Sequence, residues 1–248
     1  MRLAIGIDIG GSGIKAAVVN LDRGELHSDR IRIATPDAGN PNEIAEICKS
    51  LATALDEEHR LPIGICFPAV VRRGVTVSAA NVSDDWINLN AEQLFSKVLG
   101  QEIKVLNDAD AAGLAEMEFG AGKDQAGLVI MTTLGTGIGS AIFYDQVLVP
   151  NSELGHLDIG NVMNIETYAS SAALERENLS YQQWAKRLDV FYQHVEKIFS
   201  PDLFIIGGGV SKDHAEFLPL LNLETPVVAA MTKNSAGIIG AALGAIKR

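Results

Sequence analysis

LAIGIDIGGSGIKAAVVN, residues 3–20, and LVIMTTLGTGIGSAIFYD, residues 128–145, are two copies of one pattern. Each copy is an apolar, β-rich run, a short glycine-rich segment and a second apolar run. That order predicts a strand, a tight turn and a second strand. When the copies are aligned, Gly10 falls against Gly135, so the duplication predicts two halves of similar construction.

The two glycine turns are candidate sites for phosphate. Glycine allows the backbone to turn sharply and to approach a ligand closely, and successive N–H groups in such turns can bind an anion. Asp8 precedes the first turn, where a carboxylate can hold hydrated Mg²⁺, and Lys15 follows it within reach of the same anion. Two such turns facing each other across a cleft would hold a phosphate chain from both sides. The alternative interpretation is a pair of hairpins with permissive turns.

Neither turn matches the commoner nucleotide-binding motifs. The Gly-Lys-Ser/Thr ending of a P-loop is absent from both copies. Each turn leads into another predicted strand and not into a helix, which excludes the dinucleotide-binding fingerprint. A phosphate site built from these turns is therefore of a different kind.

Composition narrows the class of protein. A chain of 248 residues that is 47% apolar can bury a sizeable core, as one large domain or two small ones. The net charge of −11 argues against general binding to nucleic acid or to anionic membranes. No apolar run reaches the roughly 18 residues of a membrane span, and the N-terminus does not have the layout of a signal peptide. The only cysteines, Cys48 and Cys66, suit buried positions in a reducing compartment, so we expect a cytoplasmic protein.

Predicted strands and helices alternate along both halves of the chain. The strands are expected at 3–8, 14–20, 25–33, 61–67, 70–78, 103–106 and 203–206, and the helices at 41–58, 90–99, 108–119, 180–199 and 234–246. The segment 120–127 is rich in glycine and charge, which marks a domain boundary. We therefore predict two α/β domains, residues 1–122 and 123–248, flanking a cleft, and the last helix is a candidate to pack back on the first domain.

Asp108 stands where a predicted strand ends and a predicted helix begins. One interpretation is a helix cap, because Asn and Asp are favoured there. The other is a general base, because a helix N-terminus stabilises an ionised carboxylate. Such a carboxylate can orient a substrate hydroxyl and accept its proton during phosphoryl transfer.

Glu153, His156 and Glu166 form a second candidate cluster. Acids and imidazoles suit vicinal sugar hydroxyls, because they supply donors and acceptors in pairs. The amide of Asn81 offers another such pair, and Trp86 is placed either to face a sugar ring or to pack in the core. A structural role for His156 is the alternative.

Three consecutive glycines, residues 207–209, follow a predicted buried strand. They fit either close approach of the backbone to a nucleotide or phosphate chain, or a simple glycine-rich turn from strand to helix.

The chain resembles the ROK family of sugar kinases in the actin/hexokinase-like (ribonuclease H-like) superfamily, and within that family the polyphosphate glucokinases. The resemblance is carried by GIDIGGSGIKAAVV, SAANVSDDW, VLNDADAAGLAE, TTLGTGIGSAIF, PNSELGHLDIG and IIGGGVS, which occur in the family's order over nearly the whole chain. It implies transfer of a phosphoryl group from polyphosphate, ATP or both to O6 of glucose, giving glucose 6-phosphate. It also implies a requirement for Mg²⁺ and a homodimer.

The resemblance also implies a role for each matching residue. Asp108 matches the catalytic base, and Asp8 matches a Mg²⁺ ligand that acts through water. The sugar-binding positions are Asn81, Asn107, Glu153, His156 and Glu166. The phosphate-donor positions are Asp8, Gly10, Gly11, Ser12, Gly13, Lys15, Thr133, Gly135, Thr136 and Gly137, with Gly207, Gly208 and Gly209 on the nucleotide side.

One departure from the family pattern is informative. Many ROK kinases carry a cysteine-rich zinc motif between the ELGH-type segment and the last sugar-binding glutamate. Residues 157–165 of this chain contain no cysteine, so we predict no structural zinc. Polyphosphate glucokinases resemble this shorter form.

Three alternatives remain at this point. One is an ATP-dependent glucokinase or mannokinase that does not use polyphosphate. Another is a non-catalytic sugar sensor, although such ROK repressors carry an N-terminal DNA-binding segment and the first phosphate strand begins here at Leu3. An actin-like structural ATPase would explain the glycine turns but not the set Asn81, Asp108, Glu153 and His156.

Overall fold

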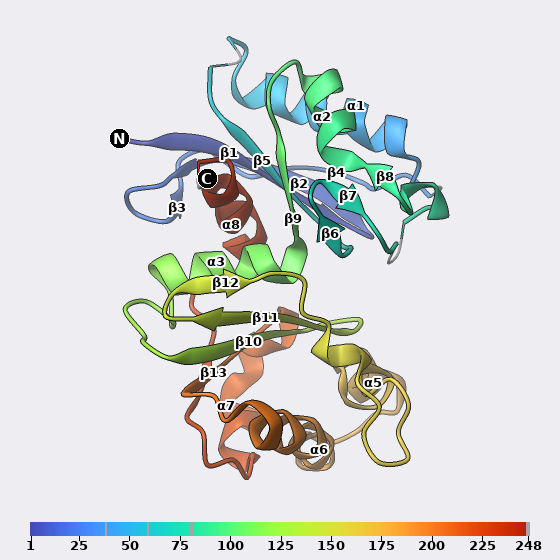
Figure 1. The fold of residues 1–248 in the computed structure, drawn as a ribbon, viewed down its shortest axis with the longest axis vertical. Coiled ribbons are helices and arrows are strands. Elements are labelled where there is room, and N and C mark those ends of the chain that lie inside the picture. The colour runs from blue at the N-terminus through green and yellow to red at the C-terminus, as the bar shows by residue number, and fades with distance from the viewer. Residues whose placement is uncertain (38, 59, 80–81, 247–248) are drawn as a thin grey trace. The chain divides into compact units, whose positions relative to one another are not determined.

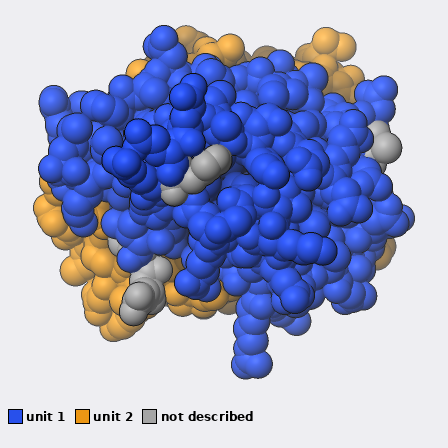
Figure 2. All heavy atoms as spheres, turned by 90° about the horizontal axis from the view of Figure 1, so that it is seen from above, with its two compact units in different colours: residues 1–115, 235–248 blue, residues 116–234 orange. Residues whose placement is uncertain are grey.

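The computed structural model describes residues 1–37, 39–58, 60–79 and 82–246, with a mixed α/β architecture (Figure 1). Residues 1–115 and 235–248 form one compact unit, and residues 116–234 form the other (Figure 2). The domains predicted from the sequence, 1–122 and 123–248, stay a prediction. No helix of the described residues is long and apolar enough to cross a membrane.

The first unit is built on a six-stranded sheet in the order β3-β2-β1-β5-β9, with β4 also paired to β2. Its strands are β1 (Leu3–Gly10), β2 (Gly13–Asn20), β3 (Glu25–Leu26), β4 (Ile31–Ile33), β5 (Ile63–Phe67) and β9 (Lys104–Asn107). The pair β1–β2 is antiparallel, whereas β1, β5 and β9 run parallel. A small separate sheet joins β6 (Val71–Arg72), β7 (Val75–Thr76) and β8 (Leu89–Asn90).

Helices cover this sheet on both faces. Alternate residues of β1 and β5, among them Ile7 and Ile65, pack in one core with α1 (Pro41–Leu55) and α2 (Ala91–Leu99). Burial of each such side chain contributes about 1.5–3 kcal/mol. Helix α8 (Ala236–Gly244) packs on β1 and β5 from the other side.

Glycine permits the close contact of α8 with the sheet. Gly6 and Gly64 are neighbours in the parallel pair β1–β5. A Cβ atom on Gly6 would overlap the carbonyl of Ile238, and one on Gly64 would overlap the carbonyl of Ala241. The backbone of α8 thus rests directly on the sheet, and this packing supports the placement of the last helix with the first half of the chain.

The second unit contains a five-stranded sheet in the order β12-β11-β10-β13-β14. Its strands are β10 (Leu128–Leu134), β11 (Ile138–Tyr144), β12 (Val147–Val149), β13 (Leu203–Gly207) and β14 (Val227–Ala229). Helix α6 (Tyr181–Phe199) packs on this sheet through a core that includes Trp184, Phe191 and Phe204. Ser180 and Gln183 form a capping box at its start. The shorter helices are α4 (Glu166–Ala169), α5 (Ser171–Arg176) and α7 (His214–Phe217).

Both predicted glycine hairpins are confirmed, but they are not identical. In the first, Gly10 pairs with Gly13 and two residues form the turn. In the second, Leu134 pairs with Ile138 and three residues form the loop. The additional loop residue shifts the pairing register by one, so equivalent positions of the two copies face different partners.

Several other strands differ in their bounds from the prediction. The predicted strand 25–33 is two short strands, β3 and β4, and the predicted 70–78 is the hairpin β6–β7. The strands β12 and β14 were not predicted, because three residues are too few to show an alternating pattern. Helix α3 (Asp108–Phe119) has the predicted bounds.

Candidate functional site

The first glycine turn lies between β1 and β2 and is supported by side chains that follow β2. Thr35 Oγ1 donates to Gly10 O at 2.5 Å, and Arg32 Nη2 donates to Ser12 O at 2.5 Å. Gly11 and Ser12 are exposed. The two carbonyl oxygens are therefore held from one side, and the outer residues of the turn remain open to a ligand.

Asp8 carries the charge beside this turn. Its neighbours across the sheet are Lys15 on β2 and Cys66 on β5. Lys15 Nζ lies 3.4 Å from Asp8 Oδ2, and Cys66 Sγ donates to Asp8 Oδ1 at 3.4 Å. The side chain of Asp8 is 20% exposed, so solvent still reaches the carboxylate.

Cys66 has the electrostatic surroundings of a site residue. Burial raises the pKa of its thiol well above the usual value, and the negative charges of Asp8 and Asp108 raise the pKa further. The thiol therefore stays protonated and remains a donor to Asp8. The sequence predicted Cys66 only as a buried packing group, which its burial confirms.

Asn107 ends β9 and Asp108 begins α3, and these adjacent residues differ in burial. Asn107 Oδ1 accepts the N–H groups of Ala109 and Asp110 at 2.9 and 3.1 Å, and its Nδ2 donates to Ala69 O. Asn107 is thus the buried N-cap of α3. Asp108, at the first helical position, is exposed. Asp108 Oδ1 also accepts the N–H of Ala109 at 2.8 Å, so Asp108 shares in capping the first turn while its side chain stays exposed.

The second glycine turn is held in a similar manner in the other unit. Gly135 O accepts from Ser171 Oγ at 2.9 Å and from the N–H of Ala172 at 3.1 Å. Glu166 Oε2 accepts the N–H of Ile138 at 3.0 Å, and a Cβ atom on Gly137 would overlap the same carboxylate. A side chain at position 137 would therefore displace the carboxylate of Glu166 from its present place.

Glu153, His156 and Glu166 lie together, as the sequence predicted. His156 ends the 3₁₀ helix η2 (Leu154–His156). Its Nδ1 is 3.9 Å from Glu153 Oε2, and its Nε2 is 3.6 Å from Glu166 Oε1. The imidazole is more than half exposed between two partly buried carboxylates. Burial raises the pKa of Glu153; the proximity of Glu166 adds to that rise and His156 opposes it.

The three consecutive glycines lie against the end of β10. Gly207 ends β13 opposite Thr133. Gly208 has φ of +88°, and a Cβ atom there would overlap the backbone of Leu134. Both observations require glycine at this position whether or not a ligand binds. Gly209 begins a 3₁₀ helix and is exposed.

Two further predicted residues have other outcomes. Asn81 lies outside the described residues. Trp86 is fully buried, lies 4.3 Å from the ring of Phe67 between centroids, and donates its indole N–H to Gly39 O at 2.8 Å. It is a core residue, so the alternative in which it faces a sugar ring is wrong.

Sequence reasoning missed Arg32 and Ser171, which brace the two turns. Arg32 lies in a predicted strand, where alternation alone could have placed it on the polar face. Its contact with a turn 20 positions earlier depends on the pairing of β4 with β2. Such a register cannot be read from the sequence of one strand.

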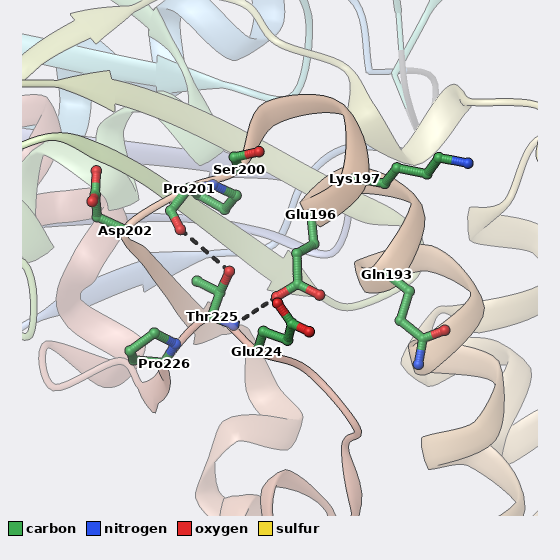
Figure 3. Close-up of a pocket in the computed structure, with 9 residues that line it drawn as sticks. All are labelled: Gln193, Glu196, Lys197, Ser200, Pro201, Asp202, Glu224, Thr225 and Pro226. Atoms are coloured by element: carbon green, nitrogen blue, oxygen red, sulfur yellow. Dashed lines mark hydrogen bonds between the residues drawn. The ribbon is translucent and has the colours of Figure 1, made fainter.

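A cavity of about 530 Å³ in the second unit lies apart from all of these residues. It lies between the C-terminal end of α6 and the segment before β14, and its walls include Glu196, Asp202 and Glu224 (Figure 3). Glu196 accepts the N–H of Thr225 at 2.6 Å, which joins the two walls. None of the predicted site residues lines this cavity.

Comparison with known proteins gives consistent matches over the whole chain. The model of the ROK family matches residues 4–193. Polyphosphate glucokinase from Mycobacterium tuberculosis is 44% identical over 246 residues, which cover 99% of this chain and 92% of that protein. The inorganic polyphosphate/ATP-glucomannokinase from Arthrobacter sp. strain KM is 46% identical with a TM-score of 0.92, covering 99% of this chain and 98% of that one.

A more distant solved structure shares the same architecture. The ROK family glucokinase from Streptomyces griseus, in complex with glucose and AMPPNP, is 25% identical with a TM-score of 0.82, covering 97% of this chain and 98% of that one. The predicted fold class, actin/hexokinase-like with two α/β domains, is confirmed by these similarities.

Proposed function

The chain belongs to the ROK family, and from that premise we propose that it transfers a phosphoryl group from polyphosphate or ATP to O6 of glucose. Relatives named for this activity match nearly its full length. The structural observation that carries the proposal is the exposed carboxylate of Asp108 at the start of α3, beside Asn107, which already caps the helix.

Asp108 is the proposed general base. Its carboxylate accepts the proton of O6 as that oxygen bonds to the terminal phosphorus of the donor. The bond from this phosphorus to the rest of the donor breaks, and the donor leaves one phosphate shorter. The N-terminus of α3 stabilises the ionised carboxylate before the reaction. A positioned base of this kind contributes about 10²–10⁴-fold to the rate.

The proposed sugar site is built around Glu153, His156 and Glu166. The carboxylates of Glu153 and Glu166 each lie within 3.9 Å of the imidazole of His156, so the group offers both acceptors and a donor. That arrangement suits neighbouring hydroxyl groups of a hexose, each of which donates one hydrogen bond and accepts others. Asn81 and Asn107 are proposed as further sugar contacts from their match to the family pattern.

The residues proposed to contact the donor are the glycine turn of each unit and, beside the first turn, Lys15 and Asp8. The residues fit Mg²⁺, since the carboxylate of Asp8 is partly exposed and hydrated Mg²⁺ is commonly held through one or two carboxylates. When bound, Mg²⁺ neutralises charge on the donor phosphates. Lys15 and the N–H groups of the turn hold the phosphate chain in place for transfer.

Other properties are part of the proposal on separate grounds. The homodimer follows from the resemblance alone. The cytoplasmic location rests on the two unpaired cysteines, the lack of structural zinc on the absence of cysteine from residues 157–165, and the lack of nucleic-acid and membrane binding on the net charge of −11. Zinc content can be measured on the purified protein, and a stoichiometric zinc ion would contradict the proposal on that point.

A coupled assay for glucose 6-phosphate tests the activity directly. Polyphosphate and ATP are supplied in parallel, with glucose or mannose as the acceptor and with Mg²⁺ or EDTA. We expect Mg²⁺-dependent product with polyphosphate and with ATP. Product with ATP alone would leave an ATP-dependent glucokinase. Glucose binding without product from either donor would indicate a sugar sensor.

A further inference from the structure

Arg32 lies beside the first glycine turn in a row of charged residues. Lys15 is the direct partner of Asp8 across β1–β2, and Arg32 is the direct partner of Lys15 across β2–β4. Directly opposed residues of antiparallel strands point to the same face of a sheet. Asp8, Lys15 and Arg32 therefore form one row on one face, next to the turn.

The guanidinium of Arg32 is seated on the turn itself. It donates to Ser12 O at 2.5 Å, and a Cβ atom on Gly13 would overlap it. Gly13 does not have a positive φ, so its backbone conformation does not require glycine. A side chain at position 13 would therefore displace the guanidinium of Arg32 from its present place on the turn.

Most of this guanidinium remains available to a ligand. Arginine carries five N–H donors, and the structure shows one of them in use. Arg32 is exposed, and no carboxylate of the described ranges pairs with it, whereas Arg2, Arg23 and Arg187 each pair with one. In a protein of net charge −11, an exposed arginine that contacts a glycine turn and pairs with no carboxylate of the described residues suggests an anionic ligand.

We propose that Arg32 binds the phosphate chain of the donor, together with Lys15. The planar guanidinium suits two oxygens of a phosphate at once, whereas the ammonium of Lys15 acts as a point charge. Arg32 binds phosphates that polyphosphate and ATP share, so both donors depend on it. This assignment rests on the proposed function for the identity of the phosphate ligand.

Kinetics of matched variants test the assignment. Arg32→Gln removes the charge, Arg32→Lys keeps it, and Arg23→Gln is the control, since Arg23 is an exposed arginine of the same unit that pairs with Glu25. We expect Arg32→Gln to raise the KM for each donor by roughly 5–30-fold, with little change in kcat or in the KM for glucose. Arg32→Lys should recover part of the loss. Unchanged donor KM values in Arg32→Gln would overturn the proposal.

Direct binding separates this inference from the proposed function. Inorganic tripolyphosphate with Mg²⁺ is titrated into each variant by calorimetry, and its affinity is measured at low and high salt. Weaker binding and a smaller salt dependence in Arg32→Gln would support the assignment even if neither donor gave product. If the wild type turns over a donor and binding is equal in all variants, the inference fails while the proposed function stands.

The contact with Gly13 provides a second test. Gly13→Ala should push the guanidinium off the turn and raise the donor KM as Arg32→Gln does. In the Arg32→Gln background the same alanine should have little further effect, because the group that it displaces is gone. An equal effect of Gly13→Ala in both backgrounds would overturn the link between Gly13 and Arg32.

Discussion

Cys66 Sγ donates to Asp8 Oδ1 at 3.4 Å, while Lys15 Nζ lies 3.4 Å from the other oxygen of the same carboxylate. A buried thiol, which also has Gly237 O as an acceptor at 3.5 Å, and a partly exposed ammonium thus contact the two oxygens of Asp8 from opposite neighbours in the sheet. A carboxylate held at both oxygens has little freedom to rotate. Asp8 is therefore oriented before any ligand binds, which is the condition for effective electrostatic stabilisation of a donor.

Removing the thiol of Cys66 should weaken the proposed binding of Mg²⁺ by Asp8 without unfolding the protein. We expect Cys66→Ala to raise the Mg²⁺ concentration needed for half-maximal activity by about three- to tenfold, because a hydrogen bond to a charged group is lost. Cys66→Ser should need a Mg²⁺ concentration close to that of the wild type, since a serine hydroxyl can also donate a hydrogen bond to Asp8. The measurement is initial rate against Mg²⁺ concentration for each variant.

Cys48 supplies the control for that experiment. It is equally buried, but it lies in the core with α1, and burial is the only cause that raises the pKa of its thiol. Cys48→Ala should lower thermal stability and leave the Mg²⁺ dependence unchanged. Equal Mg²⁺ curves for Cys66→Ala and the wild type would refute a positioning role for Cys66.

Both thiols should be unreactive in the folded protein. Cys48 and Cys66 are fully buried, and burial raises the pKa of each thiol. The unfolded chain ionises its thiols near the ordinary value of 9.0 and the folded chain does not. Stability is therefore unaffected below that pH and decreases above it. Titration with a thiol reagent should label no cysteine in buffer and two in denaturant; rapid labelling of the native protein would contradict this expectation.

The carboxylate of Glu153 should favour glucose binding but lower the stability of the folded protein. Burial raises the pKa of its carboxyl, so the ionised form is costly in the folded state. The native protein then holds a proton more tightly than the unfolded chain, and this group's contribution to stability rises as the pH falls toward 4.5. Glu153→Gln should therefore keep or raise the melting temperature at pH 7 while weakening glucose binding by about 5–100-fold. Calorimetric melting and glucose titration measure the two effects.

Glu177 serves as a control for Glu153, because the pKa of its carboxyl is lowered and not raised. Arg187 and Arg176 lower the pKa of its carboxyl to about 2. Its contribution to stability is present above the ordinary pKa of 4.5 and is lost as the pH falls toward 2. Glu177→Gln should lower the melting temperature slightly and leave glucose affinity unchanged. A fall in stability of the same size for Glu153→Gln would show that the partly buried carboxylate of Glu153 stabilises the fold.

Helices and strands were predicted well where the local sequence pattern was strong. Contacts that depend on the pairing of strands were not predicted. The bounds of α3 followed from an Asn-Asp pair after an apolar strand, and Asn107 does cap that helix. The two hairpins followed from glycine between apolar runs. Arg32 and Cys66 lie near the first glycine turn because their strands pair with those of Lys15 and Asp8, respectively. Strand pairing brings together residues far apart in the chain, so no local pattern reveals it.

Asp108 and Asn107 are adjacent, yet their variants should differ in kind. Asn107→Ala removes a side-chain cap whose loss costs about 1 kcal/mol of stability, so its melting temperature should fall. Asp108→Asn keeps size and most hydrogen bonding, so its melting temperature and glucose affinity should stay near those of the wild type. Its kcat should fall by about 10²–10⁴-fold, because an amide cannot accept the O6 proton. Thermal melting, glucose titration and kcat, measured on both variants, distinguish a helix-capping role from the role of general base. Near-normal turnover by Asp108→Asn would exclude it as the base and transfer that role to another carboxylate.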